Sequence, residues 1–325
     1  MLDYYWKVIG MCTAVSYKTK SHYFGRNLDL ERGYNERVVI TPRNYEFRYR
    51  YEKSQKSHYA LIGMATIVND YPLYFEATNE KGLSMAGLNF PNNAHYYEYQ
   101  KNMENIAPFE LIPYVLGQCA SVIEVKELLK DMNIVHCNFS NGLPVSPLHW
   151  IIADRDSSIT LECIKEGMRV YDNPFGVLTN NPTFDYHMMH MNNYMHLHEG
   201  FSKNQLQTSL SLSNYSLGMG AMGLPGDFSS SSRFVKTVFV KEKSYCNGEE
   251  KESVNQFFHI LQAVAMPKGC VLAHNGDYEY TRYSSCCNTD TQVYYFTTYE
   301  NMSIRSVNMH SIDLNDSKLS SYPID

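Results

Sequence analysis

The order of extended and helical segments most constrains how this chain can fold. Short β-rich runs fill its first third, at residues 8–17, 22–30, 37–42, 46–51, 59–68 and 82–90. Turn residues separate these runs, which predicts antiparallel strands joined by hairpins. Apolar residues then recur at helical spacing within residues 108–132, and Ser121 is expected to cap the second half of that stretch.

More strands and a further helix are predicted after residue 145. The expected strands are residues 148–154, 157–165, 168–172 and 175–180, followed by a helix over residues 253–266 and a hairpin over residues 291–309. This order lacks the βαβα alternation of a parallel sheet. We therefore expect an α+β fold of antiparallel sheets covered by helices. No linker divides the chain, so we expect one domain.

Charge and composition exclude several classes of partner. The 325 residues are 44% hydrophobic and 19% charged, which is enough for a substantial core. A net charge of -6 and the absence of any Lys and Arg run argue against nucleic acid. The sequence has no signal-peptide core and no segment as long as a membrane helix. We expect a cytoplasmic protein whose eight cysteines remain thiols.

Three familiar motifs are weak or missing. Gly218 to Gly223 matches GxGxxG, but the "LPGD" that follows prevents the helix start that a dinucleotide site needs. We expect a glycine-rich loop that allows close backbone approach. The histidines of "HMMHMNNYMHLH" lack an HExxH pattern, so partly exposed helical histidines are favoured there over the alternative of a metal site. No GxSxG elbow is present.

A serine run precedes an arginine in "GLPGDFSSSSRF". The four serines are expected to form a flexible loop, and Arg233 follows them where a glycine-rich loop could present a fixed cation to a site.

Cys12 is the remaining candidate for chemistry. A cysteine inside a β-rich run is usually a small buried hydrophobe. Here it follows Met11, and an initiator methionine before a small residue is readily removed. The exposed residue would then carry a thiol and a free α-amine, whose ordinary pKa of about 7.7–8.0 suits a general base. One residue could thus supply both nucleophile and base.

Several motifs together resemble one family. They are "MCTAVSY", "YFGRNLDL", "NEKGLSMAGLNFP", "LHWIIAD", "GVLTNNPTFDYH" and "GLPGDFSSSSRF", in this order over nearly the whole chain. The chain is similar to the conjugated bile acid hydrolases (choloylglycine hydrolases) among the N-terminal nucleophile hydrolases, a group that includes the penicillin V acylases. The resemblance implies a four-layer αββα sandwich, no cofactor, no metal and a homotetramer.

The resemblance also implies roles for individual residues. Cys12 looks like the nucleophile, and its freed amine like the base. Arg26 and Asp29 look like the pair that stabilises the thiolate and orients the amine. Asn89 and Asn180 look like oxyanion-hole positions. The list is completed by Arg233, similar to the second arginine of the site, and by Leu28, Phe139 and Leu143, similar to residues that line the steroid pocket.

The implied reaction cleaves the amide of a glycine- or taurine-conjugated bile acid through a thioester. Penicillin V acylase is the alternative, because it has the same nucleophile and arginines. Thr13 after the nucleophile, and asparagine rather than tyrosine at position 89, favour bile acids. Activity on penicillin V, or acyl transfer to other amines, would be compatible with the same site.

Residues 1–11 depart from the family pattern, which begins at the Met-Cys pair. If they remain attached, Cys12 has an amide instead of an amine and loses its base. We expect, in order of preference, translation from Met11, removal of a propeptide, or a silent homologue that binds bile acid without cleaving it. The expected organisation is thus an extension at 1–11 and one domain at 12–325.

Overall fold

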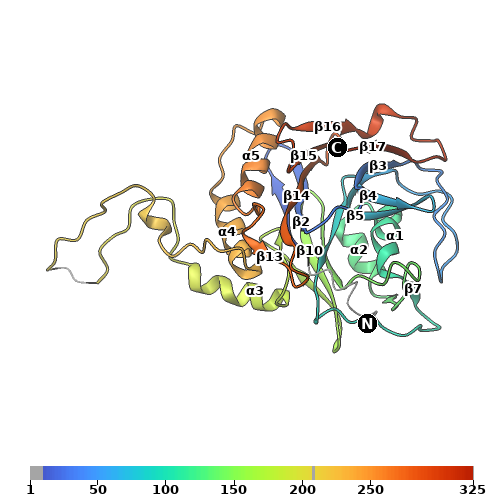
Figure 1. Cartoon of the computed structure of the whole chain (residues 1–325), viewed down its shortest axis with the longest axis horizontal. Helices are drawn as coiled ribbons and strands as arrows, with labels where there is room; N and C mark the ends of the chain where they lie inside the picture. The colour runs from blue at the N-terminus through green and yellow to red at the C-terminus, as the bar shows by residue number, and fades with distance from the viewer. Residues whose placement is uncertain (1–9, 207–208, 325) are drawn as a thin grey trace.

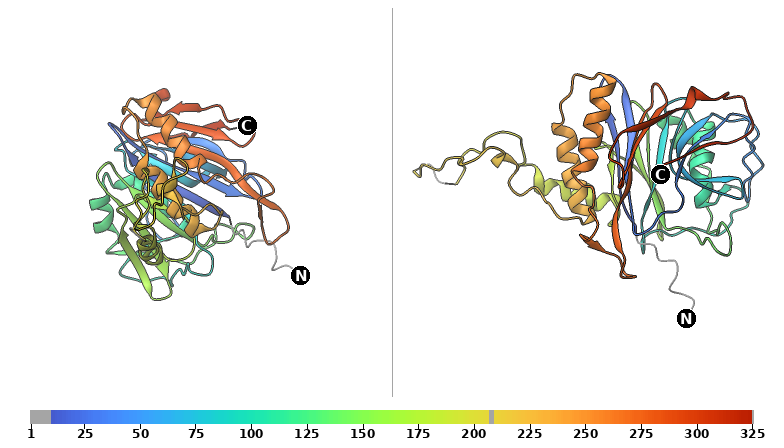
Figure 2. Two further views of the ribbon diagram at one scale, coloured as in Figure 1. Left: turned by 90° about the vertical axis from the view of Figure 1, so that its left-hand side faces the viewer. Right: turned by 45° about the horizontal axis from the view of Figure 1, so that its top comes forward.

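Two antiparallel β-sheets pack face to face, and helices cover both outer faces (Figures 1 and 2). The computed structural model describes residues 10–206 and 209–324. The expected extension therefore lies outside the described residues, except for Gly10 and Met11. The four layers follow the order helix, sheet, sheet, helix, which confirms the predicted α+β sandwich.

The first sheet carries the N-terminal hairpin, and we call it sheet I. Its strands are, in spatial order, β12 (Val177–Leu178), β1 (Met11–Lys18), β2 (His22–Leu30), β14 (Tyr278–Asn288), β15 (Val293–Thr298) and β16 (Arg305–Asn308), with β13 (Val271–Leu272) paired to β14. Strand β2 is buried along its whole length, because it lies between β1 and β14 with both faces covered.

The second sheet, called sheet II, has the last strand of the chain at one edge. Its strands are, in spatial order, β11 (Gly167–Asp172), β10 (Ser158–Ile164), β9 (Leu148–Ala153), β6 (Ser84–Asn89), β5 (Tyr71–Asn79), β4 (Leu61–Val68), β3 (Arg37–Thr41) and β17 (Ser320–Pro323). A short parallel pair, β7 (Glu104–Ile106) with β8 (Met132–Ile134), lies apart from both sheets.

Helices pack on the outer face of each sheet. Helix α5 (Glu250–Gln262) buries Phe257 and Leu261 against Val15 and Tyr23 of sheet I, and α4 (Ser230–Lys243) lies beside it. Helices α1 (Leu111–Gln118) and α2 (Val122–Leu128) cover sheet II. Ser121 caps α2 by accepting a hydrogen bond from the Glu124 amide, as predicted. Among the described residues, no helix has the length and apolar content needed to cross a membrane.

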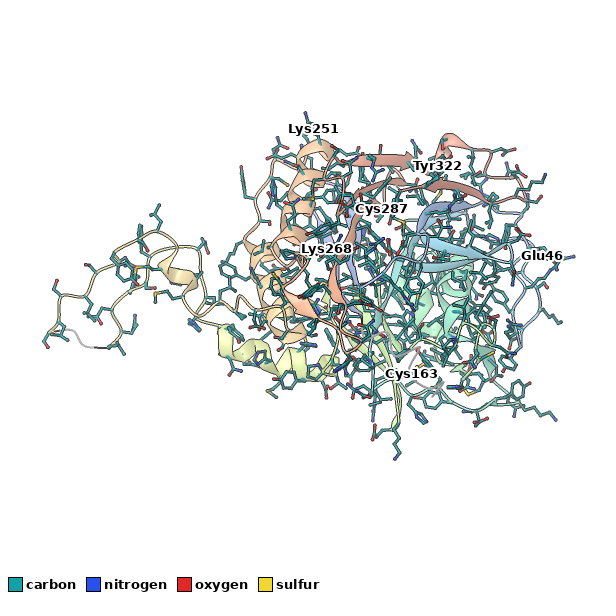
Figure 3. All side chains as sticks on the ribbon, viewed as in Figure 1. Glu46, Cys163, Lys251, Lys268, Cys287 and Tyr322 are labelled. Carbon is teal, nitrogen blue, oxygen red and sulfur yellow. The ribbon has the colours of Figure 1, made fainter. Side chains whose placement is uncertain are left out.

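Alternate side chains of β14 point to opposite faces of sheet I and so join two separate hydrophobic clusters. Cys287 belongs to the core between the sheets, whereas Cys286 packs in the cluster under α5. Figure 3 shows Cys287 among the strands and Lys251 on the exposed side of α5.

Three sequence-based expectations were wrong. Residues 46–51 form no strand of either sheet: Phe47 is buried under α1 and exchanges both backbone hydrogen bonds with Gln55, so the segment folds back on itself. The serine run does not form a flexible loop, because Ser230 begins α4 and Arg233 lies in its first turn. His187 of α3 (Phe184–His190) is fully buried rather than partly exposed.

The glycine-rich segment behaves as expected at one position. A Cβ at Gly220 would lie 2.5 Å from the carbonyl oxygens of both His198 and Gly200, so only glycine allows these backbones to approach. This contact lies in the stretch between α3 and α4, which projects away from the two sheets (Figure 1).

Candidate active site

Cys12 is the second residue of β1, at the edge where β1, β2 and β14 lie side by side. It pairs with Leu28 of β2, so its side chain points between the sheets, and it is only 3% exposed. Its neighbour Met11 pairs with Asp29, which in turn pairs with Thr281 of β14. The hairpin register thus brings residues distant in sequence to one sheet edge.

Asn180 and Arg233 hold the backbone of Cys12. The Cys12 amide donates to Asn180 Oδ1 over 2.8 Å, and Arg233 Nη2 donates to the same oxygen over 2.7 Å. Arg233 Nη1 donates to the carbonyl of Cys12 and to Thr13 Oγ1. Asn180 Nδ2 donates to the carbonyl of Asn89 over 2.7 Å. The structure therefore brings both predicted asparagines beside Cys12, with Asn180 bridging the two sheets.

Arg26 is a buried cation on the inner face of sheet I. Its Nη1 donates to the carbonyls of Gly87 and Phe75, at 2.6 and 3.1 Å, and its Nε lies 3.9 Å from Glu76 Oε2. Its Nη2 is buried and makes no hydrogen bond among the described residues. Burial opposes the charge of the guanidinium, but the neighbouring Cys12, Tyr283 and Glu76 groups outweigh it, so the pKa of Arg26 is raised above its ordinary value.

Asp29 and Glu279 form an acidic pair on the other side of Cys12. Thr281 donates to Asp29 Oδ1 over 2.6 Å, whereas Asp29 Oδ2 has no hydrogen-bond partner among the described residues. The Met11 amide donates to Glu279. Burial raises the pKa of Asp29 to about 6, although the nearby Arg233 and Thr281 lower it. Burial likewise raises the pKa of Glu279 to about 8.

The surroundings of Cys12 favour an uncharged thiol. Burial is the main cause of a raised pKa for Cys12, and Asp29 adds to it, while Arg26 and the backbone amide of Asn89 lower it. An uncharged thiol next to a peptide amide has no base. The arrangement can act as a nucleophile only when a group at the position of the Cys12 nitrogen takes up the thiol proton.

An apolar cavity of about 260 Å³ opens beside Cys12. Leu28, Phe139 and Leu143 all line it, as do Arg26 and Asn89. Residues 143–148 contribute an unbroken stretch of its wall. The cavity suits a bulky apolar group joined to a polar end at Cys12.

Some residues of this site have no signal in the sequence. Glu76 and Glu279 contact Arg26 and Met11, and neither belongs to a recognisable motif. Thr281 could have been found only from the pairing of β14 with β2. The sequence pattern did not predict β14. Within residues 10–206 and 209–324, no cluster of three His, Cys, Asp or Glu side chains is arranged to hold a metal ion.

Comparisons with known proteins identify the family. Residues 12–322 match the family model of linear amide C–N hydrolases, choloylglycine hydrolase family. A bile salt hydrolase/transferase of Lactiplantibacillus plantarum is 50% identical over 314 residues, covering 97% of each chain. One of Clostridium perfringens is 38% identical over 321 residues, covering 96% of each chain.

Solved structures share the fold. A variant of conjugated bile acid hydrolase from Clostridium perfringens superposes with a TM-score of 0.90 at 37% identity over 97% of each chain. Penicillin V acylase from Agrobacterium tumefaciens gives 0.74 at 19% identity, over 96% of this chain and 90% of that one, which shows the fold alone. The full-length family match and these relatives lead to one conclusion: the chain belongs to the choloylglycine hydrolase family of linear amide C–N hydrolases.

Proposed function

We propose that this protein hydrolyses the amide bond of glycine- or taurine-conjugated bile acids, with Cys12 Sγ as the nucleophile. The observation that carries the proposal is the position of Cys12, at the end of an apolar cavity and between two buried arginines and two asparagines. The steroid fills the cavity, and its amide carbonyl reaches Cys12 and the asparagines. Relatives at 50% and 38% identity are named bile salt hydrolase/transferase.

The reaction begins once the Met11–Cys12 bond has been cut. The freed amine of Cys12 takes the thiol proton, and the sulfur attacks the amide carbonyl carbon. Asn89 and Asn180 donate toward the oxygen that becomes negative. The carbon–nitrogen bond then breaks, and glycine or taurine leaves with the proton held by the amine. Water attacks the thioester, the amine takes its proton, and the free bile acid departs while the thiol is restored.

Charged neighbours tune the two groups of Cys12. Arg26 lowers the thiol pKa and thus favours the thiolate. Asp29, ionised above about pH 6, accepts from the amine and keeps it oriented. Arg233 donates to the carbonyl of Cys12 and to Asn180 Oδ1, so the nucleophile and the oxyanion donor stay at a fixed distance from each other.

Release of glycine from glycocholate tests the proposal. Cys12→Ala should abolish release and leave binding of cholate, measured by calorimetry, nearly unchanged. Equal release by the variant would exclude the cysteine mechanism. Penicillin V serves as the comparator substrate, since faster cleavage of penicillin V than of glycocholate would identify a penicillin acylase instead.

Retention of Met11 is the basis of a second candidate, a binding protein. In the described chain the Met11 amide contacts Glu279 and Cys12 nitrogen is a peptide amide. The intact mass of the protein purified from its native cells distinguishes the two. A chain that begins at Cys12 supports the enzyme, and a chain that retains Met11 supports the silent binder.

We further propose a cytoplasmic homotetramer of 12–325 that needs neither metal nor cofactor. The stretch between α3 and α4 exposes Leu206, Tyr215 and Leu217 at 90%, 81% and 83%, an apolar surface suited to contact with other copies. Light scattering should give four times the mass of the processed subunit. Treatment with EDTA should leave glycine release unchanged.

A further inference from the structure

His149 lies between the two segments that carry the site asparagines. Its ring stacks on Phe90, which follows Asn89, with centroids 4.2 Å apart and planes inclined by 7°. Its Nε2 lies 2.9 Å from the carbonyl oxygen of Thr179, which precedes Asn180. The imidazole is fully buried. One side chain of β9 therefore touches a direct neighbour of each asparagine.

Glu162 of β10 fixes the orientation of this ring. His149 Nδ1 lies 3.0 Å from Glu162 Oε1, and the same oxygen accepts from the Phe184 amide over 3.0 Å. The Thr179 carbonyl can only accept, so Nε2 is the donor of that bond, and Nδ1 faces the carboxylate of Glu162. Both ring nitrogens are engaged, and the ring cannot turn over without losing both hydrogen bonds.

We propose that His149 is a positioning residue, which holds Asn89 and Asn180 in register for the reaction. The inference rests on the proposed function, in which both asparagines donate toward the developing oxyanion. Asn89 belongs to sheet II and Asn180 follows a strand of sheet I, so no sheet hydrogen bond fixes their separation. The bond from Asn180 Nδ2 to the Asn89 carbonyl joins the two residues directly. His149 adds a second link, because it packs against Phe90 and bonds to the Thr179 carbonyl.

Other contacts limit how far Asn180 can move alone. Its amide donates to Ser230 Oγ over 2.8 Å, and its carbonyl accepts from His187 Nε2 over 3.0 Å. These bonds tie Asn180 to helices on the side of sheet I. With His149 lost, the bond from Asn180 Nδ2 to the Asn89 carbonyl alone spans the two segments. The Asn180 segment should then shift with α3 and α4 relative to Asn89, without unfolding either one.

His149→Phe tests the proposal, because it keeps an aromatic ring on Phe90 and removes both polar contacts. Oxyanion donors act only within a narrow geometry, so we expect kcat for glycocholate to fall about tenfold or more. KM should change less than about twofold, since the steroid contacts remain. The rate at which iodoacetamide alkylates Cys12, measured by peptide mass spectrometry, should fall by a much smaller factor than kcat.

His22→Phe is the matched control. His22 is also buried and contacts Ser16 Oγ and Thr289 Oγ1, at 2.8 and 2.9 Å, at the other end of the β1–β2 hairpin. His22→Phe should lose about as much free energy of unfolding as His149→Phe and retain the wild-type kcat. Equal loss of kcat in both variants, or a His149→Phe kcat within about twofold of wild type, would overturn the positioning role.

A conservative variant keeps the test decisive if His149→Phe does not fold. The amide nitrogen of glutamine reaches the position of Nε2, so His149→Gln can still donate to Thr179. We expect its kcat to lie between those of the wild type and His149→Phe, and at least about threefold below wild type, because the ring on Phe90 is lost. Wild-type kcat in His149→Gln would refute the inference. The wild-type enzyme tests the proposed function separately, since it alone shows whether glycocholate is cleaved.

Discussion

Glu76→Gln is expected to show how strongly the site depends on one buried carboxylate. Glu76 accepts from Ser285 over 3.0 Å and from Tyr283 over 2.7 Å, and it also accepts from Tyr294. Its Oε2 lies 3.9 Å from Arg26 Nε, and both side chains are buried. Glutamine keeps the shape but removes the charge opposite Arg26. It also places an NH₂ group where a hydroxyl now donates.

The size of the effect follows from these contacts. Removing one partner of a buried ion pair costs about 3–5 kcal/mol. Each hydrogen bond to a charged group contributes about 1.5–3 kcal/mol. The two quantities overlap because they arise from the same carboxylate, so the expected loss in the free energy of unfolding is about 3–5 kcal/mol in total. Tyr294→Phe removes one hydroxyl and keeps the charge, and should lose about 1.5–3 kcal/mol.

Urea unfolding followed by circular dichroism measures both variants under the same conditions. The rate of Cys12 alkylation against pH adds a readout at the site. Because Glu76 no longer offsets Arg26, the pKa of the Cys12 thiol should move downward in Glu76→Gln as long as Arg26 keeps its bond to Gly87. A loss below about 1 kcal/mol, or an unchanged alkylation profile, would refute the view that Glu76 balances Arg26.

Three more predictions concern pH, the cavity and the packing of the sheets. Because the pKa of Asp29 is raised to about 6, glycine release should decline as pH falls through 6, and Asp29→Asn should be inactive. A carboxyl with a raised pKa destabilises the fold above its unfolded pKa, so Asp29→Asn should unfold at higher urea than wild type above about pH 6 and lose that advantage near pH 4. Phe139→Ala should raise KM for glycocholate about tenfold with little change in kcat, since buried apolar contact is lost from the cavity wall. Gly25→Ala should prevent folding, as judged by circular dichroism, because its Cβ would lie 1.9 Å from the Ser285 carbonyl, whereas Gly142→Ala meets no atom within 4 Å and should be neutral.

The sequence predicted most of the sandwich because its strands carry the expected patterns. β4, β6, β9, β10 and the hairpin of β15 and β16 all form near their predicted bounds. β5 was not predicted, because it begins with Tyr71 and Pro72 and proline is normally depleted in strands. β14 reads "YEYTRYSSCCN", where polar residues occupy buried positions, so no alternation marks it as a strand.

The candidate site was predicted in part for a related reason. Cys12 could be identified from its place after Met11, and the other predicted positions came from several motifs in a fixed order. Glu76 and His149 act through contacts between the sheets, and Glu279 acts through a contact with Met11 from a strand distant in sequence. Nothing local in the sequence reports such contacts. A glutamate that accepts hydrogen bonds from three buried hydroxyl groups cannot be distinguished, in the sequence, from a glutamate that is exposed to water.

The placement of β14 has a consequence for how the nascent chain matures. β2 carries Arg26 and Asp29 and needs β14 as its second neighbour, yet β14 is encoded some 250 residues later. A ribosome that has made β1 and β2 has therefore produced Cys12, the proposed nucleophile, without the strand that holds Asp29 through Thr281. The proposed active site can be completed only after nearly the whole polypeptide has emerged, and an interrupted translation product contains Cys12 without the residues that surround it in the folded protein.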